Sequence, residues 1–406
     1  MKTANGWRVA RASLLLALAA SSAMPAAAGE AFDFALVGDY PYTLRDQAGM
    51  PHLLADLDHA PSLSFVLHVG DLHSPRATEC SESLFRERRD WFVGLGIPFV
   101  FTPGDNDWAD CADTPLEFLE LLRSVFFADP LRADGVDAFA LRRQSESEAH
   151  SDLVENAIWE RGGVVFATLH MIGPPLIPIP DETSATRSRL VEAAELWLDE
   201  AFRVAREHEA RGVFLATQVD LWPISGSARV LDLLHPGLID VDPLFEDFEA
   251  KLVARVREFG GPVVLAHGDT HTFRIDQPLH DEYLETLQTF TRVEGFGSPN
   301  GHWVRIRVDP ERPEVFSFQQ ELVPENLYTL IPYEVRGEND GEGRFAKLQI
   351  LARIIQAIPR VLAVVGLVAL TLGSWNLLRR CWSRRGRAKN GETHARPSTE
   401  TSEGGE

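Results

Sequence analysis

The chain has 406 residues, a hydrophobic fraction of 45% and a formal net charge of −21. This length and composition can fill the core of one large or two small domains, and they exclude a low-complexity chain. Residues 1–28 and 379–406 each carry a net charge of +3, which leaves −27 on residues 29–378 and argues against nucleic-acid binding through bulk charge.

Residues 1–28 predict a signal peptide. Basic residues precede the apolar run Leu14–Ala20, and three alanines, Ala26–Ala28, stand before Gly29. A short apolar region followed by small residues is typical of a cleaved signal, whereas the alternative of an uncleaved anchor would need a longer run. We therefore expect the rest of the chain to be exported.

Apolar runs that predict strands alternate with amphipathic runs that predict helices across residues 29–325, which we expect to form the main domain. The strands are expected at residues 32–37, 64–69, 97–101, 162–173, 213–217, 262–266, 304–308 and 314–318. The helices are expected at residues 82–95, 114–127, 187–209 and 243–259. This alternation is typical of βαβ units in a largely parallel sheet, and the continuous apolar strands indicate burial on both faces.

Five of the predicted strands end in a polar residue that can bind a ligand. These residues, four of them directly after glycine, are Asp39, Asp71, Asp105, Gln218 and Asp269. Ligands of open α/β sheets bind beyond the carboxyl ends of the strands, so we expect the five side chains to meet at one edge.

The segments Gly38-Asp39, Gly70-Asp71, Gly104-Asp105-Asn106-Asp107 and Gly268-Asp269-Thr270-His271 come in an order that resembles the calcineurin-like metallophosphoesterase superfamily over residues 32–320. The resemblance implies an α/β fold in which a β-sandwich is flanked by helices. It also implies two divalent metal ions that share a bridging carboxylate, and attack of a metal-bound hydroxide on phosphorus without a covalent enzyme intermediate.

The metal ligands that the resemblance implies include three literal matches, namely Asp39, His271 and the bridging Asp71. Asp105, Gln218 and Asp269 stand where the family has asparagine or histidine, and each can still offer an oxygen atom. This oxygen-rich set favours Mn²⁺, Mg²⁺ or Ca²⁺ over Zn²⁺, and iron is a further candidate. The alternative is that the aspartates cap helices or turns and that the glutamine only bonds to the backbone.

The catalytic histidine of the family is replaced by Asn106, which cannot donate a proton as an imidazolium can. His73, Asp107 and His302 are the candidates to replace it, and we expect His73, which lies two residues beyond the bridging aspartate. A leaving group of low pKa would need no acid, and Asp107 would then only cap the turn into Trp108.

Other polar and aromatic residues near these motifs are expected to pack or to make structural contacts: His68, His170, His267, Tyr40, Tyr42, Arg76 and Arg274. The alternatives are that one of the tyrosines reaches a metal or the substrate and that the arginines bind phosphate oxygens. His170 lies within an apolar run, which is typical of a hydrogen-bonded core histidine. Cys80 and Cys111 lie in the exported part, where we expect them to form a disulfide rather than to remain free thiols.

The C-terminal region predicts a membrane anchor. A polar stalk is expected at residues 326–350 and a transmembrane helix at 351–378, of which Val361–Leu378 is an apolar stretch of 18 residues. Such a stretch spans about 27 Å as a helix, just enough to cross a bilayer, and a buried core helix fits the polar flanks poorly. The basic residues that follow predict a cytoplasmic tail at 379–406, which its composition indicates is disordered.

The function that these patterns favour is an exported, membrane-anchored phosphoesterase, periplasmic or on the cell surface, acting on a small-molecule phosphomonoester or phosphodiester. One alternative, motivated by the lost histidines, is a catalytically silent domain that binds metal or a phosphorylated ligand. Another is a structural envelope protein whose carboxylates hold Ca²⁺. The loops at 142–157 and 174–186 would set specificity, and the sequence does not identify the substrate or its binding residues.

Overall fold

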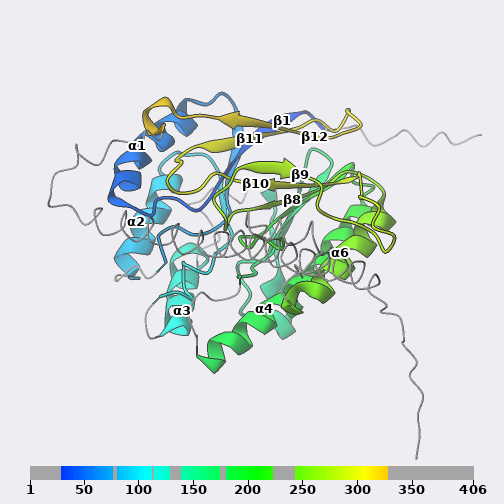
Figure 1. Cartoon of the computed structure of the whole chain (residues 1–406), viewed down its shortest axis with the longest axis horizontal. Helices are drawn as coiled ribbons and strands as arrows, with labels where there is room; N and C mark the ends of the chain where they lie inside the picture. The colour runs from blue at the N-terminus through cyan, green and yellow to red at the C-terminus, as the bar shows by residue number, and fades with distance from the viewer. Residues whose placement is uncertain are drawn as a thin grey trace, which may run out of the picture. The chain divides into compact units, whose positions relative to one another are not determined.

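Two mixed β-sheets lie against each other, and helices cover their outer faces (Figure 1). The computed structural model describes residues 29–75, 80–111, 114–128, 139–173, 180–222 and 243–327, which all belong to one compact unit. The α/β class and the pair of sheets flanked by helices agree with the fold expected from the sequence.

The first sheet has five strands in the order β12-β11-β1-β2-β3. Their bounds are β1 (Phe32–Val37), β2 (Leu63–His68), β3 (Phe99–Phe101), β11 (Trp303–Val308) and β12 (Phe316–Glu321). The first three are parallel, and β11 runs antiparallel to both β1 and β12. The outer face packs on α1 (Leu44–His59), α2 (Glu82–Val93) and α3 (Pro115–Phe126).

The second sheet has seven strands in the order β4-β5-β6-β7-β8-β10-β9. Their bounds are β4 (Arg142–Arg143), β5 (Ala157–Arg161), β6 (Val164–Thr168), β7 (Gly212–Ala216), β8 (Val263–His267), β9 (Arg274–Asp276) and β10 (Phe290–Glu294). The four strands β6, β7, β8 and β10 are parallel, and the other pairs are antiparallel. Its outer face packs on α4 (Asp181–Glu207) and α6 (Glu246–Phe259).

Four single-turn 3₁₀ helices complete the described structure: Gln144–Glu146, Glu148–His150, Pro243–Phe245 and Pro324–Asn326. The polar stalk was expected to begin at residue 326, but Asn326 is the last residue of the fourth of these helices and is buried. Its side-chain amide donates to the carbonyl oxygens of Gly49 and Gly301. The folded part therefore continues through Asn326.

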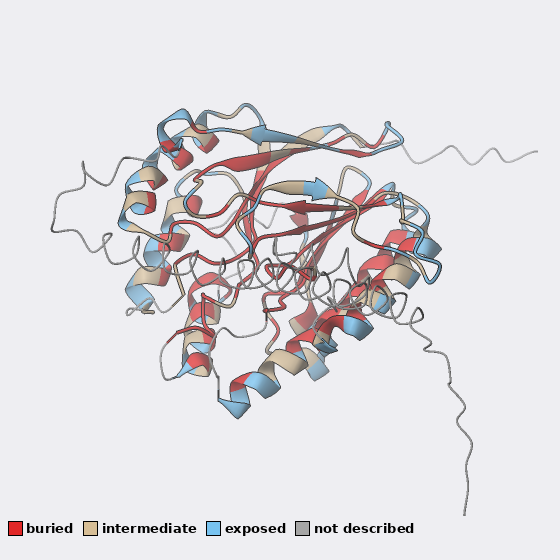
Figure 2. Cartoon of the chain, in the orientation of Figure 1, coloured by how far each residue is buried: buried red, intermediate tan, exposed pale blue. Residues whose placement is uncertain are grey.

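An aromatic core fills the space between the sheets. Phe34 of β1 stacks on Phe65 of β2 with ring centroids 4.4 Å apart, and its ring edge meets Phe214 of β7 at 5.1 Å. The intervening Ala35 and Val37 point to the helices instead, because successive side chains of a strand face opposite sides. This burial on both faces, visible along the strands in Figure 2, explains why the strands are apolar throughout.

The predicted strands and helices are present with small shifts in their bounds, and the expected pairing of the last two strands is confirmed. The largely parallel arrangement that the strand–helix alternation predicted is wrong, because both sheets contain antiparallel pairs, whereas the two sheets that the resemblance implied are present. Helix α1 and strands β4, β5, β9 and β10 were not predicted. Gly49 and Pro51 interrupt the helical pattern of α1, and buried Arg292 and Glu294 make β10 look polar.

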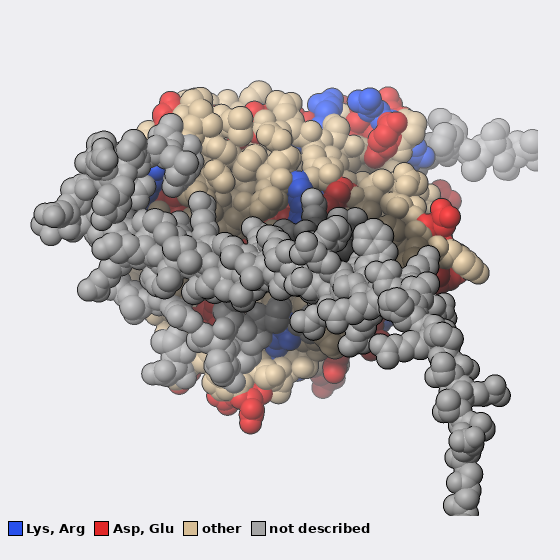
Figure 3. Space-filling model, viewed as in Figure 1, with Lys and Arg blue, Asp and Glu red and all other residues tan. Residues whose placement is uncertain are grey.

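The predicted signal peptide, most of the stalk, the transmembrane helix and the cytoplasmic tail lie outside the described residues. Among the described ranges, no helix is both long and apolar enough to span a bilayer. On the face drawn in Figure 3, the visible basic side chains of the described residues do not form a continuous patch.

Candidate metal centre

The loops that follow five parallel strands meet at one edge of the two sheets. The amide of Asp39, after β1, donates to the carbonyl of Gly70, after β2, at 2.9 Å. The amide of Asp269, after β8, donates to Asp39 Oδ1 at 3.0 Å, and the amide of Asn106, after β3, donates to Asp71 Oδ1 at 3.2 Å. Gln218, after β7, reaches Asp71 through its side chain. The structure thus brings together residues that are up to 230 positions apart in the sequence.

The backbone of these loops is unusual for residues other than glycine. Asp39, Asp71, Asp269 and His271 all have left-handed φ angles, of 51°, 60°, 80° and 57°. Such conformations are sparsely populated and cost on the order of 1–3 kcal/mol each, and they cluster at functional sites. Four of the six predicted metal ligands therefore lie in strained backbone.

Two glycines allow the loops to approach one another. A Cβ atom added to Gly268 would lie 1.9 Å from Asp39 Oδ2, and one added to Gly104 would lie 2.0 Å from Asp71 Oδ1. The glycines of the sequence motifs are thus explained by the space that the carboxylates occupy.

Asp71 lies at the centre of the cluster. Its Oδ2 atom accepts hydrogen bonds from the Tyr42 hydroxyl at 2.6 Å, from Asn106 Nδ2 at 2.8 Å and from Gln218 Nε2 at 3.2 Å. Asn106 Nδ2 also donates to the Tyr42 oxygen at 2.7 Å. Tyr42, for which packing was the favoured expectation, is therefore part of the site, and its ring edge meets His271 with centroids 4.8 Å apart.

Two buried oxygen atoms in the cluster have no hydrogen-bond partner among the described residues, namely Asp39 Oδ2 and Gln218 Oε1. His271 places Nε2 at 3.6 Å from Asp39 Oδ1. Its Nδ1 lies 2.8 Å from the Ser298 carbonyl, which can only accept, so the ring hydrogen is on Nδ1 and the Nε2 lone pair faces Asp39. Asp39 Oδ2, Gln218 Oε1 and His271 Nε2 are therefore acceptor positions on the loops of the cluster that a cation could use.

Burial and mutual repulsion disfavour the ionised carboxylates. Burial raises the pKa of Asp39 and of Asp71 well above the usual range, and neighbouring aspartates raise both further. Burial, together with the charges of Asp269 and Asp110, raises the pKa of Asp105 to about 7. Burial raises the pKa of Asp269 to about 6. Divalent cations at this position would offset the repulsion.

Asp107 has a structural position rather than a free carboxyl group. It is fully buried, and its two oxygens accept from the amides of Asp71, Leu72 and Gly104, each at 2.8 Å. These bonds join the loop after β2 to the loop after β3. This arrangement agrees with the capping alternative, because backbone amides engage both oxygens of Asp107.

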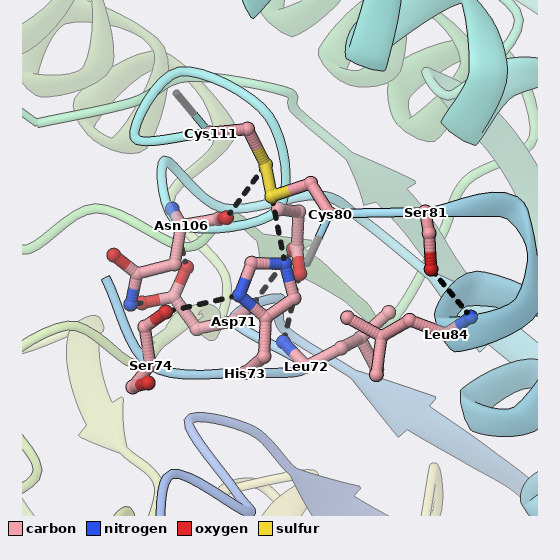
Figure 4. Close-up of a disulfide and its surroundings, with 10 residues drawn as sticks. Asp71, Leu72, His73, Ser74, Cys80, Ser81, Leu84, Asn106 and Cys111 are labelled. Atoms are coloured by element: carbon pink, nitrogen blue, oxygen red, sulfur yellow. Dashed lines mark hydrogen bonds between the residues drawn. A yellow bond between two sulfur atoms is a disulfide. The ribbon is translucent and has the colours of Figure 1, made fainter. Parts of the chain in front are cut away.

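His73 points to sulfur and not to the carboxylate cluster. Its Nδ1 lies 3.0 Å from the Ser74 carbonyl and its Nε2 lies 3.8 Å from Cys80 Sγ (Figure 4). Cys80 and Cys111 form the predicted disulfide, which links the loops after β2 and β3. His302, the other histidine considered, accepts from the Val323 amide through Nδ1 at 3.3 Å. The structure therefore brings neither histidine to Asp71.

A second buried cluster, which was not predicted, lies beside Asp269. Asp220, His267 and Glu294 place possible ligand atoms within 4.8 Å of one another. Both carboxylates are already paired, because Arg274 contacts Asp220 and lies 2.6 Å from Glu294 Oε2. The amide of Asp220 donates to Asp269 Oδ2 at 2.9 Å, so the cluster holds that carboxylate in place. The only sequence signal was the position of Asp220, two residues after Gln218.

The structural roles expected of two histidines agree with their contacts. His170 is fully buried, with Nδ1 at 2.7 Å from Glu155 and Nε2 accepting from Trp108 at 3.1 Å. His68 accepts from the Gly70 amide at 3.1 Å and so supports the loop that carries Asp71. Arg76 lies outside the described residues.

No protein-family model matches the sequence, and no curated protein matches it. A solved crystal structure is similar to the chain at 11% identity, with a TM-score of 0.37, over 72% of this chain and 100% of its own. A similarity of that extent assigns neither a family nor a function.

Proposed function

We propose that the chain is a divalent-metal-dependent phosphoesterase of the calcineurin-like metallophosphoesterase superfamily, acting on small phosphomonoesters or phosphodiesters. The observation that carries the proposal is the approach of four carboxylates and one imidazole, from four separate loops, at one edge of the sheets. These residues are Asp39, Asp71, Asp105, Asp269 and His271. Each follows a strand whose carboxyl end faces the same edge, where α/β proteins bind their ligands.

The residues present fit divalent cations by their chemistry. Buried acceptor atoms without a hydrogen-bond partner are rare, and a bound ion is one explanation for them. Asp39 Oδ2 and Gln218 Oε1 are two such atoms. Within the part of the chain that the structure describes, Asp71 Oδ2 accepts its side-chain hydrogen bonds from neutral donors. Among the described residues, burial and the charges of Asp105, Asp39 and Asp107 therefore raise the pKa of Asp71 without a cationic hydrogen-bond donor to that carboxylate.

Asp39, Asp71 and His271 would hold one ion, and Asp71, Asp105, Gln218 and Asp269 would hold the other. The second set is all oxygen, so it favours Mn²⁺, Mg²⁺ or Ca²⁺. Bound in pairs, such ions supply the positive charge that lowers the pKa of water and neutralises phosphoryl oxygens.

The other residues of the site position the ligands. Tyr42 and Asn106 donate to Asp71 Oδ2 and fix the rotation of its carboxylate. Asp107 fixes the backbone of the same loop through the Asp71 and Leu72 amides. The Ser298 carbonyl keeps the His271 hydrogen on Nδ1, which leaves Nε2 free as a ligand atom.

The test combines metal content with turnover. The purified protein should bind Mn²⁺ and hydrolyse an aryl phosphate, and a chelator should abolish the hydrolysis. Asp71→Asn should lose both properties, whereas Asp247→Asn, an exposed aspartate of α6, should retain both. Metal binding without hydrolysis of any phosphomonoester or phosphodiester in a broad panel would reject the proposal that the protein is an enzyme.

A catalytically silent binding domain is the second candidate. The contacts of His73 and His302 favour it, because both rings have partners other than Asp71 and so do not replace the family's catalytic histidine. This candidate predicts metal or phosphate-ester binding, measured by calorimetry, with no turnover of the bound ester.

We further propose that the protein is exported and anchored by its C-terminal apolar stretch, with the tail in the cytoplasm. This rests on the sequence patterns of residues 1–28 and 351–406 alone. Protease treatment of intact cells, which would digest residues 29–327 and spare the tail, is the measurement that decides it.

A further inference from the structure

Three potential ligand atoms for a thiophilic metal lie together outside the carboxylate cluster. His73 Nε2, Cys80 Sγ and Cys111 Sγ are all within 4.8 Å of one another. Cys111 is fully buried and His73 is 4% exposed, so the group is largely shielded from solvent. Figure 4 shows the imidazole beside the disulfide, between the loops after β2 and β3.

The imidazole is already oriented as a metal ligand. The Ser74 carbonyl, 3.0 Å from Nδ1, can only accept, so Nδ1 carries the hydrogen and the lone pair of Nε2 faces the sulfur atoms. Histidines that bind zinc almost always donate their other ring N–H in this way, to a carbonyl or a carboxylate. The orientation of His73 has no role in the carboxylate cluster.

The spacing also fits tetrahedral coordination. With Zn–S and Zn–N bond lengths of about 2.3 and 2.1 Å, a sulfur and a nitrogen on the same zinc ion lie about 3.6 Å apart. His73 Nε2 and Cys80 Sγ are 3.8 Å apart. Only the two sulfur atoms, joined in the disulfide, are closer than coordination allows.

We propose that reduction of the Cys80–Cys111 disulfide creates a Cys₂His site that binds a thiophilic divalent cation such as Zn²⁺. A dithiol supplies two electrons and two protons, the S–S bond breaks, two cysteine thiols form, and the dithiol becomes a disulfide. Each thiol then releases its proton to solvent as its sulfur binds the cation. Three protein ligands leave one position for water.

The site would connect the redox state to the loops of the carboxylate cluster. Cys111 Sγ lies 3.6 Å from the carbonyl of Asn106, whose amide bonds to Asp71. Cys80 lies on the same loop as Asp71. The proposal does not depend on phosphoesterase activity, because it concerns different ligand atoms.

The experiment uses Co²⁺ as an optical probe of the full chain in detergent, with Cys381→Ser in all variants so that the thiols counted are Cys80 and Cys111. The protein is reduced, the reductant is removed without air, and Co²⁺ is added. The reduced protein should develop sulfur-to-cobalt absorption, which the oxidised protein should lack, and Zn²⁺ should displace it. His73→Gln should weaken Co²⁺ binding at least about 10-fold, whereas His52→Gln, an exposed histidine of α1, should not.

Three results would overturn the proposal. One is a reduced protein that lacks sulfur-to-cobalt absorption; another is His73→Gln binding Co²⁺ as tightly as His52→Gln. The third is loss of the folded state on reduction, measured by circular dichroism, since the site needs the loops in place. Cations held by the carboxylate cluster give no sulfur band, so failure of the phosphoesterase proposal would leave this readout unchanged.

Discussion

Gly268 determines how closely the loop after β8 can approach Asp39. Because a Cβ atom there would lie 1.9 Å from Asp39 Oδ2, Gly268→Ala must displace either the carboxylate or the loop. We expect a loss of metal binding and a decrease of about 1–3 kcal/mol in the free energy of unfolding. Gly295→Ala is the matched control, because its nearest neighbour would be 3.8 Å away, and urea unfolding of both variants decides between them.

The missing imidazole beside Asp71 has a consequence for substrate choice. His73 and His302 have other partners, and Asp107 is bonded to three amides, so none protonates a leaving group. We expect aryl phosphates to be hydrolysed at least about 10²-fold faster than alkyl phosphates, because only the former leave without a proton donor. Equal kcat/KM values for 4-nitrophenyl and alkyl phosphates would show that another acid is present.

The residue types at the strand ends were readable from the sequence, but their partners were not. Asp39, Asp71 and Asp269 stand out because a carboxylate after an apolar run and a glycine is unusual. Tyr42 does not stand out, because only the turn after β1 carries its hydroxyl to Asp71. His73 was predicted to face the site from its proximity in sequence, yet the turn at Ser74 directs its ring to the disulfide.

Among the secondary-structure elements, those with uniform apolar runs were predictable and those with buried charges were not. Arg292 of β10 is fully buried because Asp276 of β9 binds its guanidinium at 2.7 and 2.5 Å, which compensates the charge. A sequence pattern cannot reveal such pairing across strands, so β9 and β10 were missed. The arrangement as two sheets likewise depends on which strands pair, which local patterns do not specify.

A buried network connects α3 with the loops around β5 and β6. Burial opposes ionisation of Glu155, but its hydrogen bond to His170 and the nearby Arg123 outweigh this and lower its pKa to about 2. A depressed folded-state pKa adds stability above the unfolded value, near 4.5, and that stability is lost as the pH falls toward 2. The contribution is on the order of 3 kcal/mol.

We therefore expect Glu155→Gln to be less stable than the wild type at pH 7 and the difference to shrink as the pH falls below about 4.5. Denaturant unfolding at several pH values between 3 and 7 measures it. A difference that stays constant over this range would show that Glu155 contributes through packing and not through its charge. Glu148→Gln, an exposed glutamate nearby, is the control.

For the whole molecule, the excess of negative charge means that bound metal ions should increase the stability of the folded state. Residues 29–378 carry a net charge of −27, and four of their carboxylates, Asp39, Asp71, Asp105 and Asp269, lie close enough to raise one another's pKa. A cation that binds only the folded state stabilises it by about 2.7 kcal/mol at 100 times its dissociation constant. We expect Mn²⁺ to raise the melting temperature and a chelator to reverse the increase. Asp71→Asn should melt at the same temperature with and without Mn²⁺.

Asp107 accepts hydrogen bonds from the amides of Asp71, Leu72 and Gly104, and these three bonds hold the loop after β2 to the loop after β3. None of these amides can exchange with solvent unless its hydrogen bond to the Asp107 carboxylate breaks. Their hydrogen–deuterium exchange should thus follow a single rate, and Asp107→Asn should speed up all three together. A displacement of either loop, caused by a bound ester or by a broken disulfide, should therefore also displace the other loop.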